Sequence, residues 1–239
     1  MGADGASREY ARSRIYKGQV VIPEETRTRL GLQTGAQGSR DATYWAPATI
    51  YRIGQSRNFT GSNLSDAPHI KAAFERVAGA MAKRPNLGRG TGVSKIRIDR
   101  GLRCEIREGP FTLATDMPEQ AGGSGSAPTP GVYGRAALGS CLATGYMMYA
   151  AKLDVPFNGL EVQIHADYDD GALFGVADVP AGYSEVRYVV SVDSDAPEAD
   201  ILRVLDAAEA HSPYLDVFSR AQRCVREVRI NAAEPTDHG

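Results

Sequence analysis

The sequence predicts an α+β fold, because strand patterns and helix patterns follow one another in separate runs. Three observations support this prediction. Alternating apolar residues mark three short strands within 95–115, a stretch with almost no charge at 130–153 predicts a long buried helix, and further strand patterns precede a helix at 197–211. The expected order is sheet, helix, sheet, helix and a final strand.

A helix at 66–84 should open the main domain. Asp66 is suited to cap it, and Pro85 and Gly88 are suited to end it. Its apolar residues recur at helical spacing and form one stripe, namely Ile70, Phe74, Val77 and Met81.

The strands within 95–115 should form an antiparallel meander, because short turns separate them. Ile96 and Ile98 alternate with charged residues in the first strand. In the second strand, Cys104 lies on the face that carries Leu102 and Ile106, which favours a core position for its thiol.

The long helix has a clear start, since Thr129 can act as its N-cap and Pro130 suits its first position. A Gly/Ser-rich loop at 121–127 precedes it, and we interpret this loop as a hinge or lid. Beyond the helix we expect strands at 160–168, 173–176, 185–193 and 224–230 and a short helix at 214–220.

The chain therefore divides into a main domain at 65–230 and a less regular N-terminal part. Residues 15–64 form an extension of uncertain fold with a strand pattern at 19–22. We expect disorder at 1–14 and in the polar tail at 231–239.

Composition indicates a globular protein of one large or two small domains. The 239 residues are 42% hydrophobic and 23% charged. No run of about 18 apolar residues occurs, and the polar start lacks an apolar signal core, so we expect a cytosolic protein without a membrane partner. Three cysteines and the isolated His165 and His211 match neither a disulfide framework nor a metal site, so we expect no metal and no cofactor.

Charge is unevenly distributed along the chain, although the net charge is −2. Residues 1–100 hold 17 Lys and Arg against 8 Asp and Glu, whereas residues 101–239 hold 10 against 21. This asymmetry is compatible with a segment that faces nucleic acid, and equally with attraction between parts of a dimer.

Cys141 is the cysteine best placed for chemistry, about three turns into the long helix. Its helix face consists largely of small residues, which let another element approach and leave the thiol in a narrow crevice. Burial without a nearby cation disfavours the thiolate, so a packed, unreactive cysteine is the alternative. Cys224 lies among three arginines but shares a strand face with Arg226.

A family resemblance rests on the loop at 121–130 and on the helix segment 136–141 that ends in Cys141. The combination of a Gly/Ser loop, a proline at a helix start and a cysteine at this distance resembles the OsmC/Ohr family of thiol-dependent hydroperoxide reductases. The similarity extends through 160–162 and 211–214, and covers roughly 93–230.

The resemblance implies an OsmC-like fold of antiparallel sheets around a long central helix, in an intertwined homodimer with active sites at the subunit interface. Cys141 would be the peroxidatic thiol, and an external thiol would reduce it. An arginine from the first hairpin would favour the thiolate and orient the peroxide, with Arg100 as the first candidate and Arg103 as the second.

Three positions depart from the family pattern. Gly131 follows the helix-start proline, where the family commonly has a glutamate that holds the arginine. Ser212 stands in Ser-Pro-Tyr where the family has its second cysteine, so Ser212 and Tyr214 are expected to contact substrate instead. Arg135 is a charge where the family helix is usually apolar, and it could pair across a dimer or approach Cys141 from the partner chain.

The segment 15–35 has a second, weaker resemblance, to the first half of AbrB-type DNA-binding hairpins. It includes Lys17-Gly18-Gln19-Val20-Val21-Ile22-Pro23 and then Leu30-Gly31-Leu32. The first function hypothesis is therefore a reductase of organic hydroperoxides or hydrogen peroxide. The alternative is a non-peroxidase protein of the same fold: a pathway-specific enzyme, a ligand binder or a redox-responsive regulator that contacts DNA.

Overall fold

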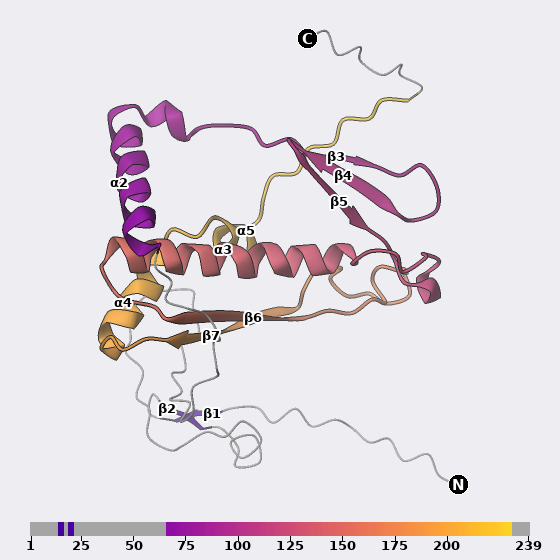
Figure 1. Cartoon of the computed structure of the whole chain (residues 1–239). Coiled ribbons are helices and arrows are strands. Elements are labelled where there is room, and N and C mark those ends of the chain that lie inside the picture. Colours follow the sequence, from indigo (N-terminus) through magenta and orange to yellow (C-terminus); the bar gives the residue numbers. More distant parts are fainter. Residues whose placement is uncertain (1–13, 17–18, 22–65, 231–239) are drawn as a thin grey trace. The chain divides into compact units, whose positions relative to one another are not determined.

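The structure is a computed structural model that describes residues 14–16, 19–21 and 66–230 (Figure 1). The chain divides into two compact units, residues 1–58 and 59–239. In the first unit, β1 (Arg14–Tyr16) and β2 (Gln19–Val21) form an antiparallel pair in which Tyr16 lies opposite Gln19. The strand predicted at 19–22 is thus confirmed over 19–21. The segment 1–14, for which disorder is expected, is described only at Arg14, which begins β1, and the tail at 231–239 and most of the extension at 15–64 lie outside the described residues.

In the second unit, helix α2 (Ala67–Lys83) is followed by the short 3₁₀ helix η1 (Pro85–Gly88), as the sequence predicts. Asp66 stands at the N-cap position, but its side chain makes no capping hydrogen bond. Only the first half of the apolar stripe is covered. The Phe74 ring lies edge-on to the Tyr149 ring at 5.6 Å, whereas Val77 and Met81 are exposed.

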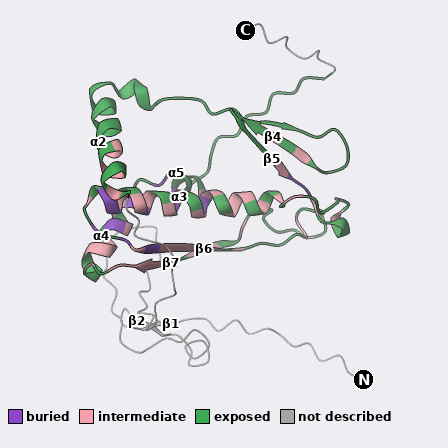
Figure 2. Cartoon of the chain, in the orientation of Figure 1, coloured by how far each residue is buried: buried purple, intermediate pink, exposed green. Residues whose placement is uncertain are grey.

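The predicted meander is confirmed as the antiparallel strands β3 (Lys95–Arg97), β4 (Cys104–Glu108) and β5 (Phe111–Thr115). Gly109 turns between β4 and β5 with a φ of 53°, a conformation that favours glycine. The apolar residues of this sheet are mostly exposed (Figure 2), including Ile96 at 59% and Phe111 at 69%. Within the described residues, this sheet therefore has an apolar surface that packs on no other layer.

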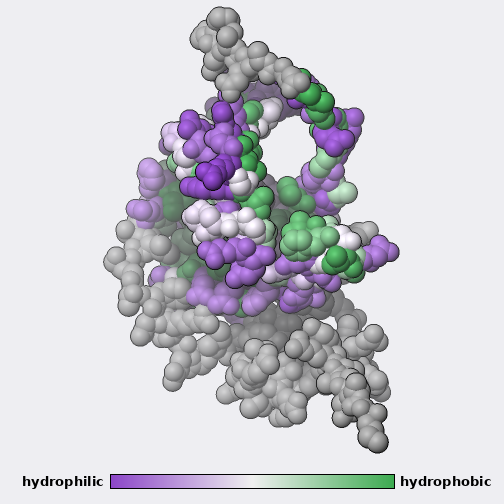
Figure 3. All heavy atoms as spheres, turned by 90° about the vertical axis from the view of Figure 1, so that its right-hand side faces the viewer, coloured by the Kyte–Doolittle hydropathy of each residue, from purple (hydrophilic) through white to green (hydrophobic). Residues whose placement is uncertain are grey.

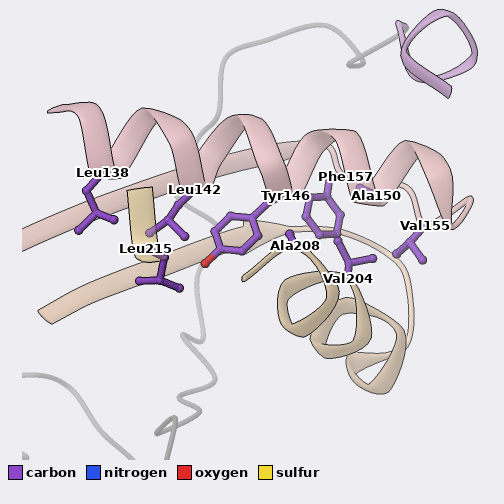
Figure 4. Close-up of a cluster of buried hydrophobic side chains, with 9 residues drawn as sticks. All are labelled: Leu138, Leu142, Tyr146, Ala150, Val155, Phe157, Val204, Ala208 and Leu215. Atoms are coloured by element: carbon purple, nitrogen blue, oxygen red, sulfur yellow. The ribbon is translucent and has the colours of Figure 1, made fainter. Parts of the chain in front are cut away.

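The long helix is also confirmed, as α3 (Pro130–Lys152). It packs on the antiparallel pair β6 (Gly159–Asp167) and β7 (Glu185–Asp193) and on α4 (Glu198–Glu209), and α5 (Pro213–Ser219) follows. Its buried face recurs every four residues and meets side chains of α4 and α5 in one core (Figure 4), formed by Leu138, Leu142, Tyr146, Ala150, Val155, Phe157, Val204, Ala208 and Leu215.

Two predicted strands are wrong. Residues 173–176 form a turn, because backbone bonds such as Val176 N–H to Gly171 O satisfy the segment locally. Residues 224–230 have no regular structure. A strand needs a neighbour for its backbone, and none of the described strands pairs with this segment, so Val225 and Ile230 stay exposed.

Hydrophobic side chains reach the surface in several places, as the face in Figure 3 shows. Even so, none of the helices in the described part of the chain combines the length and apolarity that a membrane span needs.

Candidate functional site

The structure brings together two residues that are 71 positions apart in sequence. The Sγ atom of Cys141, on α3, lies 3.6 Å from the Oγ atom of Ser212, which precedes α5. Ser212 is buried, with 7% of its surface exposed, and Cys141 is partly buried. The position expected for a second cysteine therefore does face Cys141, with a hydroxyl in place of a thiol.

The start of α5 determines the position of the Ser212 hydroxyl beside the Cys141 sulfur. Ser212 is the N-cap of α5, and its Oγ accepts a hydrogen bond from the Leu215 N–H at 3.3 Å. Pro213 occupies the first turn, where its missing N–H costs nothing. Since the N–H bond uses a lone pair of the oxygen, the single hydroxyl proton of Ser212 remains available to the Cys141 sulfur.

Small residues on α3 allow the neighbouring layers to approach. A Cβ added at Gly139 would lie 3.1 Å from Cγ1 of Ile164 on β6, which is a tight contact. On another side, a Cβ at Gly145 would lie 3.8 Å from that of Ala208 on α4. The close contact of α3 with α4 at Gly145 lies on the helix side that carries Cys141, four residues away, whereas the contact with β6 at Gly139 lies on another side of the helix.

The loop before α3 is held by a residue that the sequence analysis missed. Asp116, with 1% of its surface exposed, accepts five hydrogen bonds, from the N–H of Met117 and from the N–H and hydroxyl groups of Ser124 and Ser126. The Ser124 hydroxyl, followed by the Ser126 groups, holds the pKa of this carboxyl well below its usual range. The loop interpreted as a hinge or lid is therefore tied down at its centre. The sequence feature that could have predicted this role is an aspartate that precedes a Gly-rich loop with two serines.

The predicted arginines lie elsewhere in this chain. Arg100 and Arg103 are exposed in the turn between β3 and β4, and the structure gives neither a hydrogen bond nor an ion pair with a described residue. Tyr214 is the second residue of α5 and is 44% exposed. Of the five predicted site residues, a hydrogen bond joins only Cys141 and Ser212, and neither arginine is hydrogen-bonded to the Cys141 sulfur within the described residues.

Arg135 points toward the start of α3 and not toward Cys141. Its Nη1 donates to the Tyr183 hydroxyl at 3.4 Å, and that hydroxyl donates to the Gly131 carbonyl at 3.3 Å. This direction follows from helix geometry, in which side chains lean toward the N-terminus. Within its own chain, Arg135 therefore does not serve as a cation for the thiol.

No group of three or more His, Cys, Asp or Glu side chains that could hold a metal ion occurs among the described residues. All three cysteines are free thiols.

The stretch that carries Cys141 and Ser212 fits a known protein family. Residues 123–225 match the family model described as OsmC-like protein. This stretch is an OsmC-like domain. It includes α3, the β6–β7 pair, α4 and α5, so the family resemblance seen in the sequence is confirmed over these elements.

Solved structures similar to the OsmC-like domain share little sequence with it. An OsmC-like protein from Mycoplasma pneumoniae is 14% identical, with a TM-score of 0.44 over 54% of this chain and 86% of that one. An organic hydroperoxide resistance protein, OsmC, from Legionella pneumophila is 16% identical, with a TM-score of 0.41 over 54% and 89%. The organic hydroperoxide resistance protein OhrB of Bacillus subtilis is 16% identical, with a TM-score of 0.37 over 54% and 90%.

No curated protein matches the chain. The assignment of the OsmC-like domain therefore rests on the family model.

Proposed function

We propose that this protein is a thiol-dependent reductase of organic hydroperoxides or hydrogen peroxide, with Cys141 as the peroxidatic residue. The observation that carries this proposal is the position of the Cys141 sulfur in an OsmC-like domain, partly buried and 3.6 Å from a hydroxyl group. A hydrogen bond from that hydroxyl stabilises a thiolate relative to a thiol.

In the proposed reaction, the Cys141 thiolate attacks one oxygen of the peroxide. The S–O bond forms as the O–O bond breaks, so the sulfur is oxidised to a sulfenic acid and the peroxide is reduced. The departing oxygen takes a proton from water and leaves as an alcohol, or as water when the substrate is hydrogen peroxide.

An external thiol closes the cycle, because Ser212 cannot form a disulfide. One thiol of the reductant attacks the sulfenic acid and releases water, and a second thiol displaces Cys141 from the mixed disulfide and restores the Cys141 thiol. Cys104 lies on β4, and Cys224 lies in the irregular segment after α5, so neither takes the place of Ser212 at Cys141. The free state of all three cysteines fits a cytosolic location, where thiols stay reduced.

The active form in this proposal is a homodimer with its two sites at the subunit interface. The exposed apolar residues of the β3–β5 sheet provide a surface that a second copy could cover, and the exposed Arg100 and Arg103 lie in the turn between β3 and β4. One of these guanidinium groups, delivered by the partner chain, would favour the thiolate and orient the peroxide. Ser212 and Tyr214 would contact the substrate.

The direct test is consumption of cumene hydroperoxide or hydrogen peroxide by the full chain, with dithiothreitol or a lipoylated protein as the electron donor. We expect Cys141→Ser to abolish turnover, while Cys104→Ser and Cys224→Ser retain it. Arg100→Ala and Arg103→Ala report which arginine acts. The proposal fails if Cys141→Ser consumes peroxide as well as the parent does.

A second function is favoured by Gly131, which places no carboxylate at the start of α3 to hold an incoming arginine. In that case the protein is a pathway-specific enzyme, a ligand binder or a redox-responsive regulator. As a regulator, it would contact DNA through its basic N-terminal part. This function requires a salt-dependent shift of DNA mobility that disappears when residues 1–40 are removed.

A further inference from the structure

A buried polar cluster joins three elements close to the Cys141 site. The Tyr146 hydroxyl, on α3, donates to Oε1 of Glu209, on α4, at 2.7 Å. The phenol of Tyr188, on β7, lies near the same carboxyl group and lowers its pKa. Tyr146 is fully buried, in the row of core side chains along α3 (Figure 4). We refer to Tyr146, Tyr188 and Glu209 as the phenol clamp.

The surroundings of the Glu209 carboxyl group raise its pKa. Burial raises the pKa of the Glu209 carboxyl group, and the phenols of Tyr146 and Tyr188 lower it. The negative charge of Asp206, on the same helix, also raises this pKa, and the net shift is upward. Among the described residues, no cation contributes to this shift. Burial also raises the pKa of both phenols, so they remain hydrogen-bond donors at neutral pH. The carboxyl group thus meets two phenols from other elements, of which Tyr146 donates a hydrogen bond to it, and no cation among the described residues shifts its pKa.

The phenol clamp lies at the end of α4 from which Ser212 follows. Glu209 is the last residue of α4, and its carbonyl accepts the Ser212 N–H at 3.1 Å. The His211 N–H is also bonded, to the Ala208 carbonyl at 3.1 Å, so the turn between Glu209 and Ser212 is tight. A shift of the Glu209 backbone is therefore passed to Ser212 through this hydrogen bond, and it changes the distance between the Ser212 hydroxyl and the Cys141 sulfur.

We propose that Glu209 is a positioning residue: the phenol clamp fixes the end of α4 so that the Ser212 hydroxyl donates to the Cys141 sulfur and favours its thiolate. This inference depends on the proposed function only in taking Cys141 as the reactive thiol. One neutral hydrogen bond to a thiolate corresponds to about a threefold to tenfold change in thiolate fraction.

The test is the rate at which iodoacetamide alkylates Cys141 in the full chain, followed over a pH series by mass spectrometry of the Cys141 peptide. Glu209→Ala and Ser212→Ala should each slow alkylation at neutral pH by about threefold to tenfold. The double variant should be no slower than Ser212→Ala alone, because both changes remove the same hydrogen bond. Glu209→Gln keeps an oxygen acceptor and should recover most of the rate.

Asp200→Asn is the matched control, since its exposed ion pair with Arg203 lies on the same helix. It should leave the alkylation rate unchanged. If Glu209→Ala does not fold, the double variant Tyr146→Phe/Tyr188→Phe removes both phenol hydroxyls with little change in volume, and should slow alkylation in the same way.

An unchanged rate in the folded clamp variants overturns the proposal. The proposal is also overturned if Glu209→Ala slows alkylation by the same factor in the Ser212→Ala variant as in the parent, because a purely structural role of Glu209 would give this result. Peroxide consumption is not part of this measurement. A parent that shows the predicted coupling but consumes no peroxide would refute the proposed function and leave the role of Glu209 intact.

Discussion

The Arg135 guanidinium covers the position of Gly131: its Nη1 atom lies 3.3 Å from the point that a Cβ on Gly131 would occupy. Gly131 is in the first turn of α3, four residues before Arg135, so the two positions are neighbours on the helix surface. The chain thus has a cation next to the position where the family resemblance implies a glutamate.

Gly131→Glu should therefore create an ion pair within α3. The new carboxylate would meet Arg135 at i,i+4 spacing and the positive end of the helix dipole, after a small shift of the flexible guanidinium. Compared with Gly131→Gln, which has the same backbone effect, we expect the free energy of unfolding in urea to rise by about 0.3–1 kcal/mol at low salt. Equal stability of the Glu and Gln variants would contradict this prediction.

Asp116 should make the stability of the protein sensitive to acid. Its pKa is lowered in the folded state by the Ser124 and Ser126 groups, so its contribution is complete above the ordinary value of 3.8 and is lost as the pH falls from there toward the folded pKa. Thermal unfolding at falling pH should show a smaller acid-dependent loss in Asp116→Asn than in the parent, from a lower starting Tm.

The matched control for this prediction is Asp195→Asn, which removes an exposed carboxylate that accepts a hydrogen bond from the Asn158 amide. Its Tm should follow that of the parent at every pH. An acid profile of Asp116→Asn that is parallel to the parent would mean that the five hydrogen bonds do not stabilise the ionised carboxyl group.

Gly123→Ala should destabilise the loop before α3 strongly. A Cβ there would lie 1.9 Å from the carbonyl oxygen of Met117, a backbone atom that cannot move without breaking the hydrogen bonds to Asp116. We expect a loss of about 1–3 kcal/mol in the free energy of unfolding, by analogy with an overpacked core. Gly79→Ala, in α2 with no atom within 4 Å of the added Cβ, should be neutral or stabilising by up to about 1 kcal/mol.

Ser212→Cys should convert the site to one with a resolving thiol. The Cys141 sulfur is 3.6 Å from the present hydroxyl, and a rotamer change would bring two sulfurs to the bond length of about 2.05 Å. One equivalent of cumene hydroperoxide should give an intramolecular disulfide, seen by mass spectrometry as the loss of two hydrogens. Cys141→Ser in the same background should form none, and direct overoxidation of Cys141 without a disulfide would contradict the prediction.

Much of the secondary structure was predictable because local patterns determine it. The run 130–152 has few charges, which predicts a buried helix, and Thr129 before Pro130 predicts where this helix begins. The structure has a helix at these residues. The alternation and turns between 95 and 115 likewise suffice for a meander. The strands expected at 173–176 and 224–230 are wrong because a short apolar segment does not supply its own partner strand, and the pairing decides whether such a segment becomes a strand.

The sequence alone, through its resemblance to a family, indicated Cys141 as the thiol to consider and implied that Ser212 stands where that family has a second cysteine. Only the tertiary structure decided that Ser212 contacts Cys141, that Arg135 turns away from it, and that Glu209 meets two phenols from other elements. These contacts join residues far apart in the chain, and the packing of α3 against α4, α5 and β7 brings them together. Periodicity in a sequence reports which face of an element is apolar, but it does not report which residue of another element lies opposite.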